Sequence, residues 1–497
     1  MTVERPRRHA QHAVVRHLIG IFRNPDIQII RDLIYLAFGQ VSAKIVGFVL
    51  FAYLARVLEP SEYGALETLL AIVGFAALVV DFGLGSAAVR HRAQDEPDRD
   101  TVIGIVPALR MLLAVPCMLG MWIAVLFVTD DPVVRSLGGL FALSLVFHAW
   151  KQEWLLQSLE LLRVVALAQF LRVALMAAIV MATVKGSEDL AWVGIAEVVT
   201  FAALSAVYLL VQLRFGFGIR LNLERTVAGP LMRQALPLGL NTAVWGLIQN
   251  VPMLLVGLFG GLEQAAYLAA AQRLTTSLQS VSYVYHFNMF AALTRRFQRG
   301  KEQLQKLSLA SIRLVAWASI GPAAICAAYA GDILGVIFGA NYVTAGPVLA
   351  VIIFIVPIQI LSGHYRWALT AAGETRSVLW SGLAGAAVSA LCSAALAPLI
   401  GAMGGAMAAV AAGLTIWWVS SYECRKLGLP LPILSRIGLP VVASAVSMLP
   451  AFVLPALPLA AGLSLSAAIY GALALILDRK RIYPDLRHLA YAKEGTR

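Results

Sequence analysis

The chain has 497 residues, of which 60% are hydrophobic and 13% are charged, and its mean hydropathy is +0.80. A soluble domain is about a quarter charged, so this composition excludes a soluble globular protein and indicates an all-α polytopic membrane protein. A net charge of +12 would suggest a nucleic-acid partner for a soluble protein, but no run of Lys and Arg is interleaved with aromatic residues. We therefore expect no nucleic-acid partner, and anionic membrane lipids as the partner of the basic loops.

Residues 1–31 form a basic N-terminal segment ahead of the first apolar stretch. Within it, residues 11–22 place Val14, Leu18 and Ile21 on one helical face, which predicts a short interfacial helix on the cytoplasmic leaflet. Asn24 and Pro25 then give a start signal for the first long helix, with Asn as the cap and Pro in the first turn.

Fourteen apolar stretches follow, each long enough to cross a hydrocarbon core of about 30 Å, which takes about 20 residues. They are residues 32–56, 64–88, 102–128, 134–158, 162–184, 190–213, 231–259, 264–294, 307–330, 344–371, 376–399, 402–424, 435–455 and 457–478. The last pair is the least regular, because Pro450, Pro455 and Pro458 could make it one broken or re-entrant segment.

The charge between these stretches alternates along the chain. Most of every second gap is rich in Lys and Arg, whereas the gaps between hold mainly acids such as Glu59, Asp130 and Glu263. Because basic loops stay in the cytoplasm, the pattern predicts an even number of crossings with both termini inside.

An internal repeat divides the chain. Residues 58–64 and 259–267 are both short acidic turns in which a tyrosine, Tyr63 or Tyr267, opens the next stretch. Six stretches separate the copies, so both run in the same direction through the membrane. This predicts two six-helix lobes related by a pseudo-twofold axis along the membrane normal, enclosing a central cavity, with a C-terminal helix pair appended.

The predicted organisation follows from that repeat. It comprises a basic cytoplasmic N-terminus with the short interfacial helix (1–31), an N-lobe (32–213), a basic cytoplasmic linker (214–230), a C-lobe (231–424), a final pair of spans (425–478) and a basic cytoplasmic tail (479–497).

Several charged residues lie inside these stretches, although a charge at mid-membrane costs about 2.5–3.5 kcal/mol even on the mildest scale. The cations are Lys44, Arg110, Lys151, Arg172, Arg273 and Arg366, and they outnumber the acids. They are expected to line a watery cavity, and a cationic cavity implies an anionic cargo carrying phosphate or carboxylate. Arg110, Lys151 and Arg366 lie near the cytoplasmic boundary, so simple snorkelling remains an alternative for them.

The acids Asp81, Glu153 and Glu197 allow two interpretations. A carboxylate in the cavity can couple transport to an ion gradient, or it can serve as a structural charge partner. Asp81 would brace a helix break at residues 81–85, and Glu153 would neutralise Lys151.

Three tryptophans accompany these charges: Trp150, Trp154 and Trp367. Their indole rings could stack on sugar rings, although tryptophans of an interfacial belt are commoner. The chain shows no P-loop, nucleotide-binding fold, metal-ligand spacing or Ser/His/Asp set, so we expect no cofactor and no use of ATP. The four cysteines are expected to be free and buried.

Four segments resemble Wzx-type polysaccharide exporters, the oligosaccharide flippase family of the multidrug/oligosaccharidyl-lipid/polysaccharide (MOP) exporter superfamily. They are residues 54–64 (LARVLEPSEYG), 81–90 (DFGLGSAAVR), 235–241 (ALPLGLN) and 267–274 (YLAAAQRL). The resemblance covers the first twelve spans and fades over the last pair.

The resemblance implies a transporter, not an enzyme, in the inner membrane of a bacterium. Relatives move an undecaprenyl-diphosphate-linked oligosaccharide to the periplasmic leaflet by alternating access, often coupled to an H⁺ or Na⁺ gradient, for a lipopolysaccharide or exopolysaccharide pathway with its polymerase and chain-length machinery. The important cationic residues of the first and eighth helices of related lipid II flippases correspond to Lys44 and Arg273. Where some relatives carry an acid in the seventh helix, this chain has Gln249 and Asn250.

Three alternatives stay open at this point. A multidrug or small-molecule exporter of the same superfamily usually has acids in its cavity, against the cationic excess here. A membrane polysaccharide polymerase or ligase needs a sizeable outer loop with catalytic Arg or His, whereas residues 331–343 are short and contain neither. A passive scaffold does not need intramembrane charges.

Overall fold

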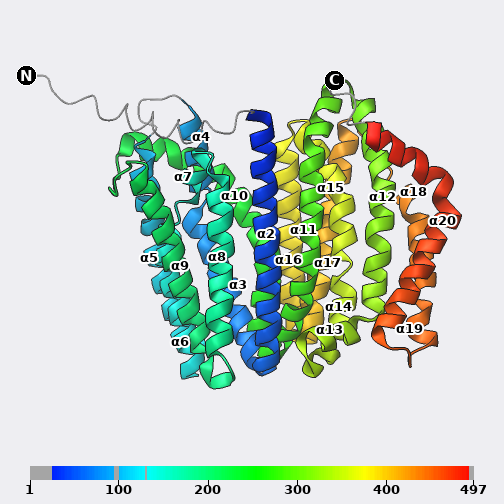
Figure 1. The fold of residues 1–497 in the computed structure, drawn as a ribbon, viewed down its shortest axis with the longest axis horizontal. Coiled ribbons are helices and arrows are strands. Elements are labelled where there is room, and N and C mark those ends of the chain that lie inside the picture. Colours follow the sequence, from blue (N-terminus) through cyan, green and yellow to red (C-terminus); the bar gives the residue numbers. More distant parts are fainter. Residues whose placement is uncertain (1–24, 95–99, 129–130, 492–497) are drawn as a thin grey trace, which may run out of the picture.

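The computed structural model describes residues 25–94, 100–128 and 131–491, and within them it contains helices and no strands. The predicted interfacial helix at 11–22 lies outside these residues. The described part of helix α2 runs from Pro25, and the predicted cap Asn24 also lies outside the described residues. The helices stand side by side in one bundle, in which α2 starts and α20 ends at the same end (Figure 1). We call this the proximal end and the opposite one the distal end.

The N-lobe holds α2 to α9, which correspond to the first six predicted spans. Its helices are α2 (Pro25–Val57), α3 (Pro60–Asp81), α4 (Leu84–Ala93), α5 (Val102–Val128), α6 (Pro132–Ala149), α7 (Glu153–Ser158), α8 (Leu162–Thr183) and α9 (Ala191–Arg214). A helix-free linker runs from α9 to α10.

The C-lobe holds the next six spans, and two more helical segments follow it. The C-lobe helices are α10 (Arg225–Leu255), α11 (Leu262–Gln298), α12 (Lys301–Ala328), α13 (Ala330–Phe338), α14 (Gly346–Ile352), α15 (Ile355–Ala371), α16 (Thr375–Ile400) and α17 (Ala402–Lys426). The final pair consists of α18 (Leu434–Ser447) with α19 (Leu449–Val453), and α20 (Leu459–Tyr491).

Every predicted span is a helical segment, which confirms the all-α polytopic fold. In the described part of the chain, thirteen segments are long and apolar enough to cross a membrane. The one predicted span missing from these thirteen is the eighth, which is α11, a helix of 37 residues that is too polar to meet that criterion. A long central helix can be this polar only if much of it faces something other than lipid.

The last two spans are separate. Residues 434–453 and 459–479 each form a candidate membrane span. Pro450 lies near the end of the first span, and Pro455 and Pro458 lie between the two. The pair packs on α12 through a buried polar contact, in which the indole Nε1 of Trp317 donates to Asp478 over 2.9 Å. The hydroxyl of Tyr470 donates to the carbonyl of Trp317 over 3.0 Å.

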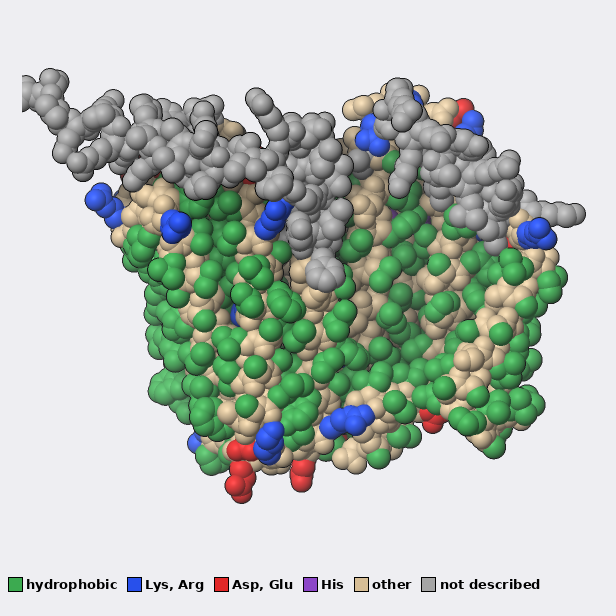
Figure 2. All heavy atoms as spheres, in the orientation of Figure 1, with side chains coloured by type: hydrophobic (Ala, Val, Ile, Leu, Met, Phe, Trp, Pro, Cys, Tyr) green, Lys and Arg blue, Asp and Glu red, His purple; other side chains and the backbone are tan. Residues whose placement is uncertain are grey.

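The surface separates into an apolar band and two charged rims. Figure 2 shows hydrophobic side chains over the middle of the bundle, with mainly Lys and Arg at the proximal rim and Asp and Glu, together with some Lys and Arg, at the distal rim. This distribution is typical of a protein that spans a membrane.

Near the proximal end, the backbones of the two lobes meet at glycines. Helix α3 stops at Asp81, and Phe82 and Gly83 take left-handed conformations with φ of 37° and 76°. This is the break predicted at residues 81–85. A Cβ on Gly239 of α10 would lie 2.4 Å from the carbonyl oxygen of Phe82, so this contact requires glycine.

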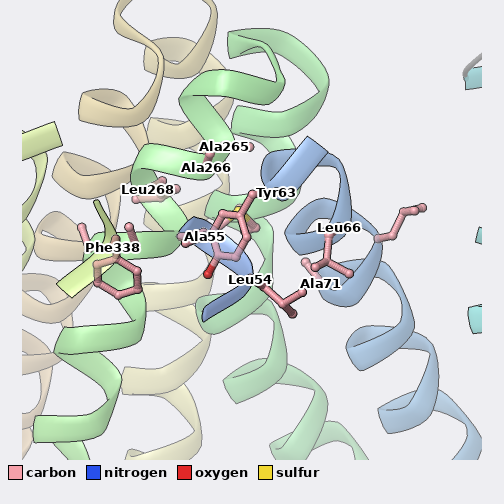
Figure 3. Close-up of a cluster of buried hydrophobic side chains, with 14 of the residues drawn as sticks. Leu54, Ala55, Tyr63, Leu66, Ala71, Ala265, Ala266, Leu268 and Phe338 are labelled. Carbon is pink, nitrogen blue, oxygen red and sulfur yellow. The ribbon is translucent and has the colours of Figure 1, made fainter. Parts of the chain in front are cut away.

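At the distal end the two lobes share one buried hydrophobic cluster. Figure 3 shows Leu54 of α2 and Tyr63 of α3 beside Ala265 of α11 and Phe338 of α13. Tyr63 and Tyr267, the repeat-related tyrosines, both pack edge-on against Tyr342, with ring centroids 6.0 and 6.2 Å away. We call Tyr63, Tyr267, Phe338 and Tyr342 the distal aromatic cluster.

Candidate functional site

A cavity of about 670 Å³ lies between the two lobes. Its walls come from α2, α3, α6, α8 and α9 of the N-lobe and from α10 and α11 of the C-lobe. Helix α11 forms one of these walls, and its polar residues Gln272, Arg273 and Thr276 face the cavity. This explains why the eighth span is the least apolar of the long helices.

Four of the predicted site residues line this cavity: Lys44, Arg172, Glu197 and Arg273. A fifth charged residue, Glu67 of α3, lines it as well and was not among the predicted site residues. Counting Lys, Arg, Asp and Glu, the described walls carry three cations and two acids. The cationic excess is therefore one charge, smaller than the sequence alone suggested.

Arg273 and Glu67 form an ion pair between the lobes. The guanidinium Nε donates to one carboxylate oxygen over 2.9 Å and a terminal nitrogen donates to the other over 2.8 Å, which is the bidentate fork geometry. The ring of Phe51 lies under the guanidinium at 3.4 Å. Since Arg273 is on α11 and Glu67 on α3, the contact joins the C-lobe to the N-lobe.

Lys44 of α2 reaches the other lobe too, but without a carboxylate. Its ammonium donates to the hydroxyl of Ser280 on α11 over 2.5 Å, and within the described part of the chain no acid pairs with it. Among the described residues that line the cavity, Lys44 is thus the cation without a carboxylate partner.

Arg172 and Glu197 pair within the N-lobe. Their closest charged atoms are 3.6 Å apart, on α8 and α9, and the guanidinium lies 4.3 Å from the ring of Phe201. Glu197 therefore has the charge-partner geometry that the sequence allowed, and its role in ion coupling stays a prediction.

The C-lobe wall is mostly uncharged. Gln249 and Asn250 of α10 and Gln272 and Thr276 of α11 face the cavity beside Arg273. The side-chain amide of Asn250 donates to the carbonyl of Gly246 over 3.0 Å. The N-lobe wall of the cavity thus carries several charges, whereas the C-lobe wall carries amides, a hydroxyl and the charge of Arg273.

The remaining cations of the N-lobe lie away from the cavity. Arg110 is buried, donates to the carboxylate of Asp81 and donates to the carbonyl of Lys151 over 2.7 Å. Lys151 pairs with Glu153 at 2.8 Å. Asp81 at the end of α3 thus contacts Arg110, and Glu153 contacts Lys151, while the role of either acid stays a prediction.

The predicted sugar-contacting tryptophans do not line the cavity either. Trp154 is buried and donates to the side chain of Gln152 over 2.6 Å, and Trp150 caps α6. Trp367 packs among aromatic rings of α11, and Arg366 lies 4.8 Å from the ring of Trp245. A sugar-binding role for these residues stays a prediction that this cavity does not support.

Glu67 could have been found from the sequence. It lies inside the stretch 64–88, where it is an intramembrane carboxylate by the same criterion that singled out Asp81. Its partner could not have been assigned, because Arg273 is 206 positions away along the chain.

Solved structures of similar architecture are membrane transporters. The lipid II flippase MurJ, in an inward closed conformation, matches with a TM-score of 0.75 and 11% identity over 90% of this chain and 100% of that chain. An inward-facing multidrug resistance MATE family transporter matches with a TM-score of 0.61 and 13% identity over 82% and 98%. A MOP superfamily transporter from Pyrococcus furiosus matches with a TM-score of 0.55 and 14% identity over 82% and 96%. The protein is therefore a multi-pass membrane protein with the transporter fold of the MOP superfamily.

The family is defined by sequence as well as by fold. Residues 29–285, more than half of the chain, match the family model described as polysaccharide biosynthesis protein, and the chain belongs to this family. No curated protein matches the chain at a significant level.

Proposed function

We propose that this protein is a flippase that moves an undecaprenyl-diphosphate-linked oligosaccharide from the cytoplasmic to the periplasmic leaflet of a bacterial inner membrane. Both termini lie in the cytoplasm, and the proximal end of the bundle faces it. The observation that carries the proposal is the inter-lobe cavity of a polysaccharide biosynthesis family member, in which Lys44 and Arg273 reach across from opposite lobes.

The chemistry of the cavity suits such a cargo. Its volume of about 670 Å³ lies within the range of about 300–1,000 Å³ typical of small-molecule sites, enough for a diphosphate with an attached sugar. Lys44 and Arg273 replace the hydration of the diphosphate, and the amide wall offers donors and acceptors to sugar hydroxyls. The polyprenyl tail stays in the lipid beside the lobes.

Alternating access then follows from where the site is built. Because both lobes contribute to it, a rocking motion of one lobe against the other splits the site and weakens its hold on the phosphate. Coupling to an H⁺ or Na⁺ gradient and contact with a polysaccharide polymerase and its chain-length machinery are part of this proposal.

A small-molecule exporter of the same superfamily is the second candidate. The observation that favours it is the presence of two acids, Glu67 and Glu197, in the cavity wall. Both acids are already paired with arginines, however, and the charge left over belongs to Lys44. A cavity with this balance is better suited to an anionic cargo than to a cationic drug.

The experiment that tests the proposal follows lipid-linked glycan in cells depleted of the protein. We expect the glycan to accumulate in the cytoplasmic leaflet and surface polysaccharide to fall. The wild type should restore output, whereas Arg273→Ala and Lys44→Ala should not. Arg376→Ala and Lys306→Ala remove the same charges from exposed positions outside the cavity and serve as matched controls. Intact polysaccharide without accumulation would overturn the proposal in favour of the exporter.

A further inference from the structure

Glu67 occupies the place on Arg273 that a phosphate would take. A guanidinium fork binds carboxylate and phosphate in the same bidentate way, and here both arms of the fork are engaged by Glu67, at 2.9 and 2.8 Å. The side chain of Glu67 is 7% exposed and that of Arg273 is 31% exposed. Both residues line the cavity, and the arginine is the more exposed of the two while the carboxylate is nearly buried.

The pair sits next to the contact that closes the distal end. Tyr63 lies one turn before Glu67 on α3, and Tyr267 lies on the same helix as Arg273. Both rings pack on Tyr342 in the distal aromatic cluster. Arg56 of α2 adds a second link between the lobes, since its Nε donates to the carbonyl of Ile337 at the end of α13 over 2.9 Å.

A second contact between α2 and α11 lies on the proximal side of this pair. Lys44 meets Ser280, and Phe51 meets Arg273. Each helix advances by seven residues between the two contacts, which is about 10.5 Å at 1.5 Å per residue. An anion that arrives from the proximal side finds the ammonium of Lys44 first, with no carboxylate to compete. It finds the guanidinium of Arg273 about two turns deeper, with Glu67 in place.

We propose that Glu67 is an internal stand-in for the anionic group of the cargo, which holds Arg273 while the cavity is empty and is displaced when a phosphate binds. The inference rests on the proposed function for the identity of the cargo, but the exchange itself requires only a phosphate-bearing ligand.

Displacement has a mechanical consequence because the pair joins the lobes. Once Arg273 turns to the phosphate, Glu67 is left buried without a partner, which is strongly unfavourable. The strain is relieved when Glu67 gains access to water, and that requires α3 to move away from α11. Binding of the anion therefore weakens the contact between the lobes at the distal end, where the cargo is to be released.

If phosphate displaces Glu67 from Arg273, Glu67 is a positioning residue that competes with the anion. Removing its charge should therefore improve anion binding. The binding of inorganic pyrophosphate to the purified full-length protein in detergent, measured by calorimetry, tests this. We expect Glu67→Gln to bind about tenfold more tightly than the wild type, which corresponds to about 1.4 kcal/mol. Arg273→Ala should lose most of the binding. Glu302→Gln, which removes an exposed acid at the start of α12, should bind like the wild type.

A second measurement follows the distal end, and its main comparison uses chains that keep Glu67, so it does not depend on whether the Glu67 variant folds. A single cysteine replaces Ala265, a buried residue beside the distal aromatic cluster, in a background without the native cysteines. In the otherwise wild-type chain, pyrophosphate should raise the labelling rate of this cysteine. In Glu67→Gln the rate should be high before any anion is added.

The outcomes separate the two proposals. If the wild type binds pyrophosphate but Glu67→Gln binds it equally and labelling does not change, the exchange is wrong while the anion site stands. If neither the wild type nor Glu67→Gln binds pyrophosphate, the anionic cargo itself is contradicted, and the exchange with it.

Discussion

The cavity holds two arginine–glutamate pairs that differ in what they join. Arg172 and Glu197 belong to adjacent helices of one lobe and approach to 3.6 Å, whereas Arg273 and Glu67 belong to different lobes and form a bidentate contact at 2.8–2.9 Å. A rigid movement of one lobe leaves the first pair intact and breaks the second. Two pairs of the same composition can thus serve different purposes, one in holding a lobe together and the other in linking its position to the cargo.

The largest effect should come from the inter-lobe arginine. Arg273→Ala should abolish export while the protein still inserts, because it removes the guanidinium fork and leaves Glu67 buried and unpaired. Arg273→Lys should be partly defective, since an ammonium cannot make the bidentate contact. Surface polysaccharide output, normalised to the amount of protein in the membrane, measures both. Normal output from Arg273→Ala would remove any distinction between the two pairs.

Loss of the unpaired cation should come next. Lys44→Ala should reduce export by at least about tenfold, equivalent to about 1.4 kcal/mol of cargo binding. Lys44→Arg should keep much of it, because the charge is retained. The dependence of transport rate on cargo concentration measures the effect. An unchanged rate at low cargo concentration in Lys44→Ala would mean that the cargo does not meet this ammonium.

The close contact between Gly239 and Phe82, which joins the lobes, can be disturbed by a substitution that changes no charge. In Gly239→Ala the added methyl would lie 2.4 Å from the carbonyl oxygen of Phe82, an overpacking that costs about 1–3 kcal/mol and pushes the lobes apart near the proximal end. Gly229→Ala on the same helix is the matched control, because its new methyl meets nothing within 4 Å. Thermal unfolding of the two variants measures the difference. Equal melting temperatures would show that the contact between Gly239 and Phe82 accommodates the added methyl without loss of stability.

The smallest effect should come from the pair within the N-lobe. Glu197→Gln should lower the free energy of unfolding by about 1 kcal/mol, because it removes the charge attraction to Arg172 across 3.6 Å while the contact of Arg172 with the ring of Phe201 remains. Export per folded molecule should then keep the pH dependence of the wild type. A pH profile that flattens in Glu197→Gln would instead identify this carboxylate as the coupling acid.

The sequence predicted the architecture because the membrane imposes it locally. A hydrocarbon core demands long apolar helices, and each predicted span is a helical segment in the structure, including the pair that Pro450, Pro455 and Pro458 made uncertain. The repeat was readable because its two copies retain the same short turn. Their tyrosines, Tyr63 and Tyr267, pack on one ring of the structure.

The partners of the charges were not predictable in the same way. Intramembrane charges are easy to find, but which of them meet depends on contacts between distant segments, and Glu67 and Arg273 come from different lobes. The position of a charge along its span did not show whether it lines the cavity. Arg110 and Lys151 make contacts within the N-lobe and do not line the cavity. A pattern of hydropathy gives the depth of a residue, and the direction in which it faces depends on how the helices pack.

The most direct measurement is the movement of a fluorescent undecaprenyl-diphosphate disaccharide between leaflets of vesicles that contain the purified protein. A membrane-impermeant quencher reports how much of the probe faces outward. The account predicts that the wild type equilibrates the probe, that Arg273→Ala does not, and that the same lipid without its diphosphate is not moved. Equal movement of the probe by wild type and Arg273→Ala would contradict the claim that a cationic site between the lobes carries the cargo.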